Sequence, residues 1–79
     1  MRIYAIKDKA TGFGTLINCN NDFHAMRMAH DTVNAEEDSL LKRHPEDYDL
    51  YCLGELNTES GEIKPEQRFM NNLADLKKA

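Results

Sequence analysis

The chain contains no tryptophan, only two cysteines and two prolines, and no long apolar segment. Cys19 and Cys52 are too few for a disulfide framework or a tetrahedral zinc site, so both are predicted to be reduced, small apolar residues. No stretch approaches the roughly 20 apolar residues that span a bilayer, and the first residues have no hydrophobic signal region. We therefore expect no membrane contact and a protein that stays in the compartment where it is made.

Basic charge is also scarce, because ten Lys and Arg residues stand against 14 Asp and Glu residues, for a net charge of −4. Nonspecific binding of nucleic acid by the whole surface is disfavoured, since neutralising phosphates requires clustered Lys and Arg. The charge is uneven: residues 31–63 carry two basic and ten acidic side chains, whereas the segments on either side have a basic excess. A dipolar surface with an acidic middle third is expected.

What is present fits one small globular domain with a thin core. Of the 79 residues, 41% are hydrophobic and 30% are charged, and a domain of this size buries only roughly 60 to 65% of the surface of its unfolded chain. Burial against a partner or a second copy is therefore expected. A homodimer is the simplest form of this expectation.

Apolar periodicity and turn residues predict an α+β fold. The expected architecture is a small antiparallel sheet of about four strands in ββαββ order, packed on one main helix, with a short C-terminal helix. The asparagines before residue 22 are N-cap residues for the main helix. Residues 1–66 are predicted to form the ββαββ domain and residues 67–79 a helical tail. The expected elements are strands at 2–7, 15–19 and 48–56, a main helix from about 22 to 36, a short extended piece ending at residue 65, and a helix over 66–76.

The strand expected at 48–56 carries bulky apolar residues on both of its faces. Tyr51 and Leu53 alternate with Leu50 and Cys52, whereas a strand covered on one face only would place polar residues on the other. Tyr51 and Leu53 therefore need a second cover, such as a partner subunit, the tail or a ligand. With Phe69 from the tail, they form the predicted oligomer interface.

No arrangement of catalytic or metal-binding residues is recognisable in the sequence. His24 and His30 are six positions apart, so on a helix they point in different directions and do not aim at one ion. His44 is a turn residue whose imidazole could hydrogen-bond to Glu46 or Asp47. We expect no enzyme activity, no cofactor and no metal.

Cationic and aromatic residues in the first predicted hairpin favour binding of single-stranded nucleic acid. Such sites stack bases on aromatic side chains above a cationic groove. The simpler interpretation remains open, because Tyr4 could be a core residue and lysines near a sheet edge also prevent aggregation. The candidate nucleic-acid-binding residues are Arg2, Tyr4, Lys7, Lys9, Phe13 and Arg27.

The residues assembled so far resemble the small nonstructural protein of gokushovirus-type microviruses, tailless phages with circular single-stranded DNA genomes. The resemblance covers roughly residues 1–66, and its most specific part is the block from His44 to Pro65. The earlier parts are the strand Arg2-Ile3-Tyr4-Ala5-Ile6, with Asp8-Lys9, and helix positions Asn21-Asp22, Ala25, Arg27, Asp31 and Val33-Asn34.

The resemblance implies a nonstructural, DNA-binding protein that acts in genome synthesis or packaging in the cytoplasm of the infected bacterial host. The segment after Pro65 departs from the family pattern. Two hypotheses follow. The first is a dimeric accessory protein that binds single-stranded DNA. The second is an acidic regulator that uses Glu36, Glu37 and Asp38 to engage a basic viral or host replication or packaging factor.

Overall fold

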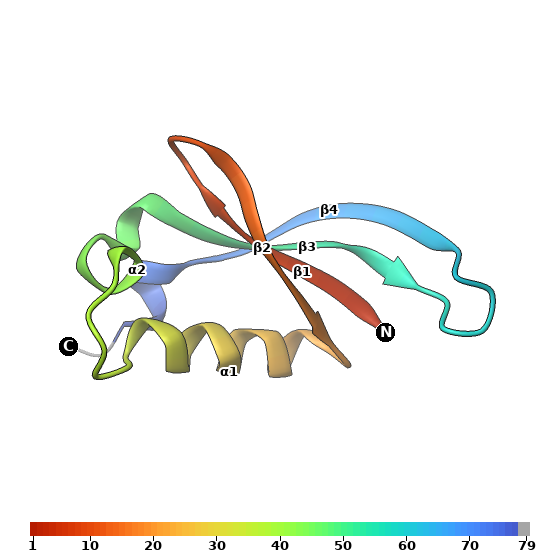
Figure 1. The fold of residues 1–79 in the computed structure, drawn as a ribbon, viewed down its shortest axis with the longest axis horizontal. Helices are drawn as coiled ribbons and strands as arrows, with labels where there is room; N and C mark the ends of the chain where they lie inside the picture. Colours follow the sequence, from red (N-terminus) through yellow and green to blue (C-terminus); the bar gives the residue numbers. More distant parts are fainter. Residues whose placement is uncertain (78–79) are drawn as a thin grey trace.

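A computed structural model describes residues 1–77 as one antiparallel sheet with a long helix lying along one side (Figure 1). The strand order is β2-β1-β3-β4, so β2 and β4 are the edges. This arrangement confirms the predicted α+β class and ββαββ order. The elements are β1 (Arg2–Asp8), β2 (Gly12–Cys19), α1 (Asp22–Val33), α2 (Leu40–Arg43), the 3-10 turn η1 (Pro45–Asp47), β3 (Tyr48–Leu56), β4 (Ile63–Asn72) and the 3-10 turn η2 (Leu73–Leu76).

Helix α1 begins at the position predicted from the asparagines before residue 22, and the residues that it buries are its smallest apolar ones. The Asn21 side chain accepts a hydrogen bond from the backbone N–H of His24 at 2.9 Å, which satisfies one of the free donors of the first turn. Ala25, Ala29 and Val33 are fully buried, whereas Phe23 is 76% exposed. The small side chains let the helix approach the sheet closely and leave the Phe23 ring outside.

The core lies between α1 and one face of the sheet. Tyr4 and Ile6 of β1 and Leu50 and Cys52 of β3 point to this side, and Leu73 of η2 closes one end. Because successive side chains of a strand point to opposite faces, the residues between them lie on the other face. Both Cys19 and Cys52 are buried free thiols, as predicted.

The predicted C-terminal helix is wrong over most of its length. Residues up to Asn72 continue β4, and only Leu73–Leu76 forms a single 3-10 turn. Pairing with β3, including Tyr51 opposite Phe69, overrides the helical spacing of the apolar residues because it satisfies the backbone along the β3 edge. The predicted boundary after residue 66 falls inside β4, and residues 78–79 of the predicted tail lie outside the described residues.

Candidate nucleic-acid interface

Three aromatic side chains form a row across the sheet face opposite α1. Phe13 of β2 and Tyr51 of β3 have ring centroids 5.2 Å apart, and Tyr51 and Phe69 of β4 are 5.7 Å apart. Both contacts are edge-to-face, with interplanar angles of 83° and 78°, a geometry that aromatic pairs favour. We call these three residues the aromatic row, and the sheet face that carries them the open face.

The open face has no second layer within residues 1–77, because the helix packs on the other side (Figure 1). Phe13 is 43% and Phe69 is 53% exposed, and Tyr51 between them is half-buried. Leu16 of β2 extends the apolar surface and is 66% exposed. Aromatic and aliphatic groups of this size would not remain uncovered without a functional reason, since clustered exposed apolar surface marks an interaction site.

A single ammonium group lies against the aromatic row. The Nζ atom of Lys7 is 5.4 Å from the ring centroid of Phe13 and 5.7 Å from that of Tyr51, within the range of a cation–π contact. The strand register places Lys7 at this point of the sheet, because Lys7 of β1 pairs with Phe13 of β2 on one side and with Asp49 of β3 on the other. The open face therefore places the Lys7 ammonium against two of the three rings, with Asp49 as its cross-strand neighbour.

The structure combines parts of two sites that the sequence suggested separately. Lys7 and Phe13, predicted to bind nucleic acid, lie beside Tyr51 and Phe69, predicted to bind a second subunit. Leu53 is half-buried and forms a bulge in β3. Ile3 pairs with Gly54 and Tyr4 pairs with Cys52, so Leu53 between them has no partner in β1. Four of the predicted residues, Lys7, Phe13, Tyr51 and Phe69, therefore lie on one shared surface.

The remaining predicted DNA contacts lie away from the aromatic row. Tyr4 is fully buried on the helix side of the sheet, so the prediction that it stacks on a base is wrong. Arg2 is half-buried and pairs with Asp22, and Arg27 is exposed on α1, in the other layer of the fold. Lys9 is exposed in the turn after β1. The alternation of side chains along β1 was enough to predict that Tyr4 and Lys7 point to opposite faces of the sheet, since the two residues are an odd number of positions apart.

Asp22, the first residue of α1, binds three side chains from two strands, β1 and β4. The Tyr4 hydroxyl donates to Asp22 Oδ1 at 2.6 Å, and Arg68 of β4 donates to Oδ2 at 2.9 Å. Arg2 lies 3.6 Å from the same carboxylate. The Tyr4 hydrogen bond and the two guanidinium groups lower the pKa of Asp22, and burial, followed by the bond to Asp22, raises the pKa of Tyr4.

Replacing Asp22 with asparagine is expected to lower the free energy of unfolding by about 1 to 2 kcal/mol, because charge-assisted hydrogen bonds are lost. The pKa of Asp22 is lower in the folded state than in the unfolded state. The stability that the Asp22 carboxylate contributes is therefore fully present above the unfolded-state pKa of about 3.9, and it is lost as the pH falls through the folded-state pKa. Urea denaturation at pH 7 and at pH 2.5 measures this. The difference between wild type and D22N should shrink at the lower pH, and a constant difference would contradict this role.

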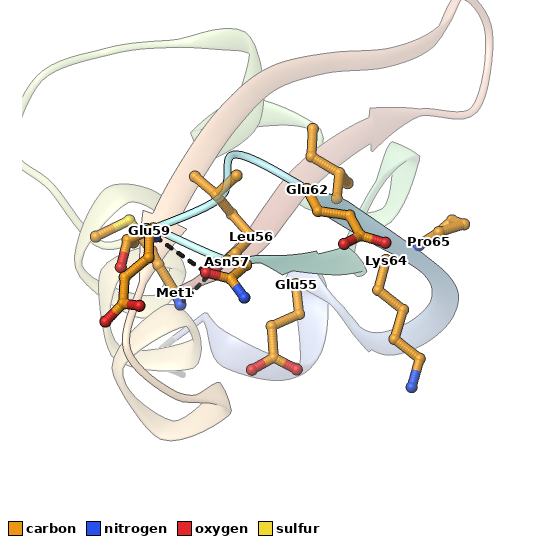
Figure 2. A pocket seen from close by; sticks show the side chains of 10 residues that line it. Met1, Glu55, Leu56, Asn57, Glu59, Glu62, Lys64 and Pro65 are labelled. Atoms are coloured by element: carbon orange, nitrogen blue, oxygen red, sulfur yellow. Dashed lines mark hydrogen bonds between the residues drawn. The ribbon is translucent and has the colours of Figure 1, made fainter.

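A cavity of about 820 Å³ lies at the far end of the β3–β4 hairpin beside the N-terminus (Figure 2). Its lining includes Glu55, Glu59 and Glu62, none of which forms an ion pair within residues 1–77, together with apolar Leu56 and Ile63. The three glutamates outnumber the one lysine of the lining, Lys64, and none of the aromatic row lines this cavity. It suits a cationic group better than a phosphate.

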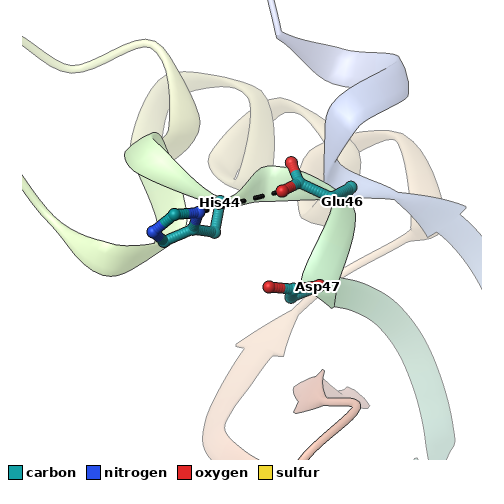
Figure 3. Close-up of side chains that lie close together, drawn as sticks. All are labelled: His44, Glu46 and Asp47. Atoms are coloured by element: carbon teal, nitrogen blue, oxygen red, sulfur yellow. Dashed lines mark ion pairs between the residues drawn. The ribbon is translucent and has the colours of Figure 1, made fainter.

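The turn before β3 brings His44, Glu46 and Asp47 together (Figure 3). Their potential ligand atoms lie within 4.8 Å of one another, and His44 Nδ1 is 3.8 Å from Glu46 Oε1. This distance exceeds that of a hydrogen bond and corresponds to a loose ion pair when His44 is protonated. These groups could contact a divalent cation, but all three are exposed, and we assign no metal to them.

The fold and the open face define a small α+β protein with an uncovered aromatic sheet surface. The family model described as Phage ORF5 protein matches residues 1–76, almost the whole chain. The chain therefore belongs to the Phage ORF5 protein family, which confirms the expectation of a phage protein. Comparisons with curated proteins and with solved structures gave no match. Among the described residues, no helix is both long and apolar enough to cross a membrane.

Proposed function

We propose that the protein is a non-enzymatic phage accessory protein that binds single-stranded DNA on its open face. The observation that carries the proposal is the aromatic row with Lys7 beside it. Together with the resemblance to the small nonstructural proteins of gokushovirus-type microviruses, it favours a role in viral genome synthesis or packaging within the cytoplasm of the infected bacterium.

Stacking supplies most of the affinity in this proposal. Each base stacked on an aromatic side chain contributes about 1 to 3 kcal/mol, with little dependence on sequence. The edge-to-face contacts within the aromatic row hold the rings in place, so less side-chain freedom is lost on binding. A duplex keeps its base faces inside the helical stack, so single-stranded DNA is the preferred ligand.

Phosphate contacts are few, because the basic side chains are mostly engaged elsewhere. Arg2 and Arg68 face the Asp22 carboxylate. Lys7 beside the aromatic row, and Lys9 two residues further along the chain in the exposed turn after β1, are the phosphate contacts that we propose. The net charge of −4 repels the DNA backbone at longer range. Binding is therefore expected to be of modest affinity and only moderately dependent on salt.

Replacing Lys7 and Lys9 together with alanine is expected to weaken binding of oligo-dT without unfolding the protein. If each lysine contacts one phosphate, the slope of log affinity against log salt should become less negative by about 1.4. Fluorescence anisotropy with labelled oligo-dT at several salt concentrations measures this slope. Lys64→Ala is the control, because Lys64 is exposed at the far hairpin. An unchanged slope in the double variant would contradict the assigned phosphate contacts.

The alternative function, an acidic regulator that engages a basic replication or packaging factor, is favoured by the three glutamates of the hairpin cavity, which form no ion pair within residues 1–77. Asp38, one of its three residues predicted from the sequence, already pairs with Arg43 at 3.3 Å. Gel shifts with single-stranded and duplex DNA at low salt separate the two functions. Absence of DNA binding, with a partner captured in a pull-down and lost on charge reversal at Glu36, Glu37 and Asp38, would favour the regulator.

A further inference from the structure

The two edges of the sheet differ sharply in chemical character. The edge strand β4 carries Lys64, Pro65, Glu66 and Arg68, and charged residues and proline are the usual means by which proteins block pairing at an exposed edge. The other edge strand, β2, has the sequence GFGTLINC and contains neither a charged residue nor a proline. Only one edge of this sheet is therefore open to pairing.

The regular part of the β2 edge is its second half. Ala5 pairs with Leu16 and Lys7 with Phe13, so two residues, Gly14 and Thr15, stand opposite Ile6 in a bulge. A bulge twists the strand and disrupts pairing locally. The four residues from Leu16 to Cys19 follow β1 in unbroken register and run to the start of α1 (Figure 1).

The helix layer presents one exposed apolar side chain, Met28, beside this edge. The sulfur atoms of Cys19 and Met28 are 3.4 Å apart, which places Met28 on the side of α1 next to β2. Met28 is 39% exposed and Leu16 is 66% exposed. A partner at this edge would therefore meet unpaired backbone groups between two exposed apolar side chains, one in each layer.

We propose that a second copy of the chain pairs with this edge, β2 against β2 in antiparallel orientation, through residues 16–19. An identical strand suits the site because a twofold axis covers both open edges at once and stops further growth. The segment is uncharged, so the contact brings no like charges together. For antiparallel edges the axis is perpendicular to the sheet, which gives one eight-stranded sheet with both aromatic rows on the same side.

This mode of dimerisation differs from the one that the sequence suggested. An interface through Tyr51, Leu53 and Phe69 would cover the aromatic row, whereas pairing at β2 leaves it accessible in both copies. The inference does not rest on DNA binding, since it follows from the composition and exposure of the edge. Sedimentation and hydrogen exchange can test it without any nucleic acid.

The experiment measures self-association of the full chain by sedimentation equilibrium and compares two lysine substitutions. Leu16→Lys places a charge on the β2 edge and is expected to raise the dimer dissociation constant at least tenfold. Ile63→Lys is the matched control on the β4 edge, where the native side chain is 58% exposed, and it should leave the constant unchanged. Hydrogen exchange at the amides of residues 16–19 should slow as the protein concentration rises.

Four results would overturn the proposal. A wild-type chain that remains monomeric at the highest soluble concentration would exclude the dimer. A dimer that Leu16→Lys leaves intact, or one without added amide protection at residues 16–19, would exclude the β2 edge. Dissociation by Phe69→Lys would show instead that the copies meet through the open face, because Phe69 is distant from β2 in the strand order.

Discussion

Replacing Tyr51 with alanine is expected to weaken binding of oligo-dT by about 5- to 150-fold, the equivalent of one lost stacking contact of about 1 to 3 kcal/mol. Tyr51 is the central ring of the aromatic row and contacts both Phe13 and Phe69. Its removal therefore takes away one stacking surface and loosens the two that remain. Fluorescence anisotropy with labelled oligo-dT at low salt measures the effect.

Two further variants make the Tyr51 experiment specific. Phe23→Ala removes an exposed ring from α1, in the other layer of the fold, and should bind DNA like the wild type. Tyr51→Phe keeps the ring and should retain most of the affinity. If Tyr51→Ala bound as tightly as the wild type, or if Phe23→Ala lost as much affinity, the open face would not be the binding surface.

Replacing Gly54 with alanine is expected to lower the free energy of unfolding by about 3 kcal/mol, the upper part of the range for overpacking. A Cβ atom at this position would lie 2.4 Å from the backbone carbonyl oxygen of Lys64 and 3.2 Å from Cα of Pro65. Gly54 pairs with Pro65, so β3 and β4 would have to separate to make room. Urea denaturation followed by circular dichroism measures the change.

Gly14→Ala provides the matched control for this prediction. The nearest atom to a Cβ at Gly14 is the Ile6 carbonyl oxygen at 3.7 Å, an ordinary contact distance. The expected change in the free energy of unfolding is below about 1 kcal/mol. Equal losses of stability in the two variants would contradict the claim that the close approach of β3 and β4 requires glycine at position 54.

The sequence was sufficient to predict the layers of the fold. Alternating apolar residues and the Asn21 cap located β1, β3 and the start of α1, because these signals are local. The end of the chain was mispredicted as a helix. The spacing of Phe69, Leu73 and Leu76 fits a helix, but the β3 edge offers residues up to Asn72 a long-range pairing that local spacing does not reveal.

The candidate site could be predicted only in part, for a related reason. Residue types predicted Lys7 and Phe13 as nucleic-acid-binding residues and Tyr51 and Phe69 as part of an oligomer interface. That these four side chains lie together depends on the register of four strands. The hydrogen bonds from Tyr4 to Asp22 and from Arg68 to Asp22 also depend on tertiary structure, because Arg68 follows Asp22 by 46 positions in the sequence. Sequence patterns therefore identified most of the residues without showing that they share one surface.

The most direct test of the central claim, that single-stranded DNA binds on the open face, is an NMR titration of the labelled protein with oligo-dT. The largest shifts are expected at Lys7 and at the rings of Phe13, Tyr51 and Phe69, with α1 little affected. Shifts confined to α1 or to the acidic β3–β4 hairpin, or no shifts at low salt, would contradict it.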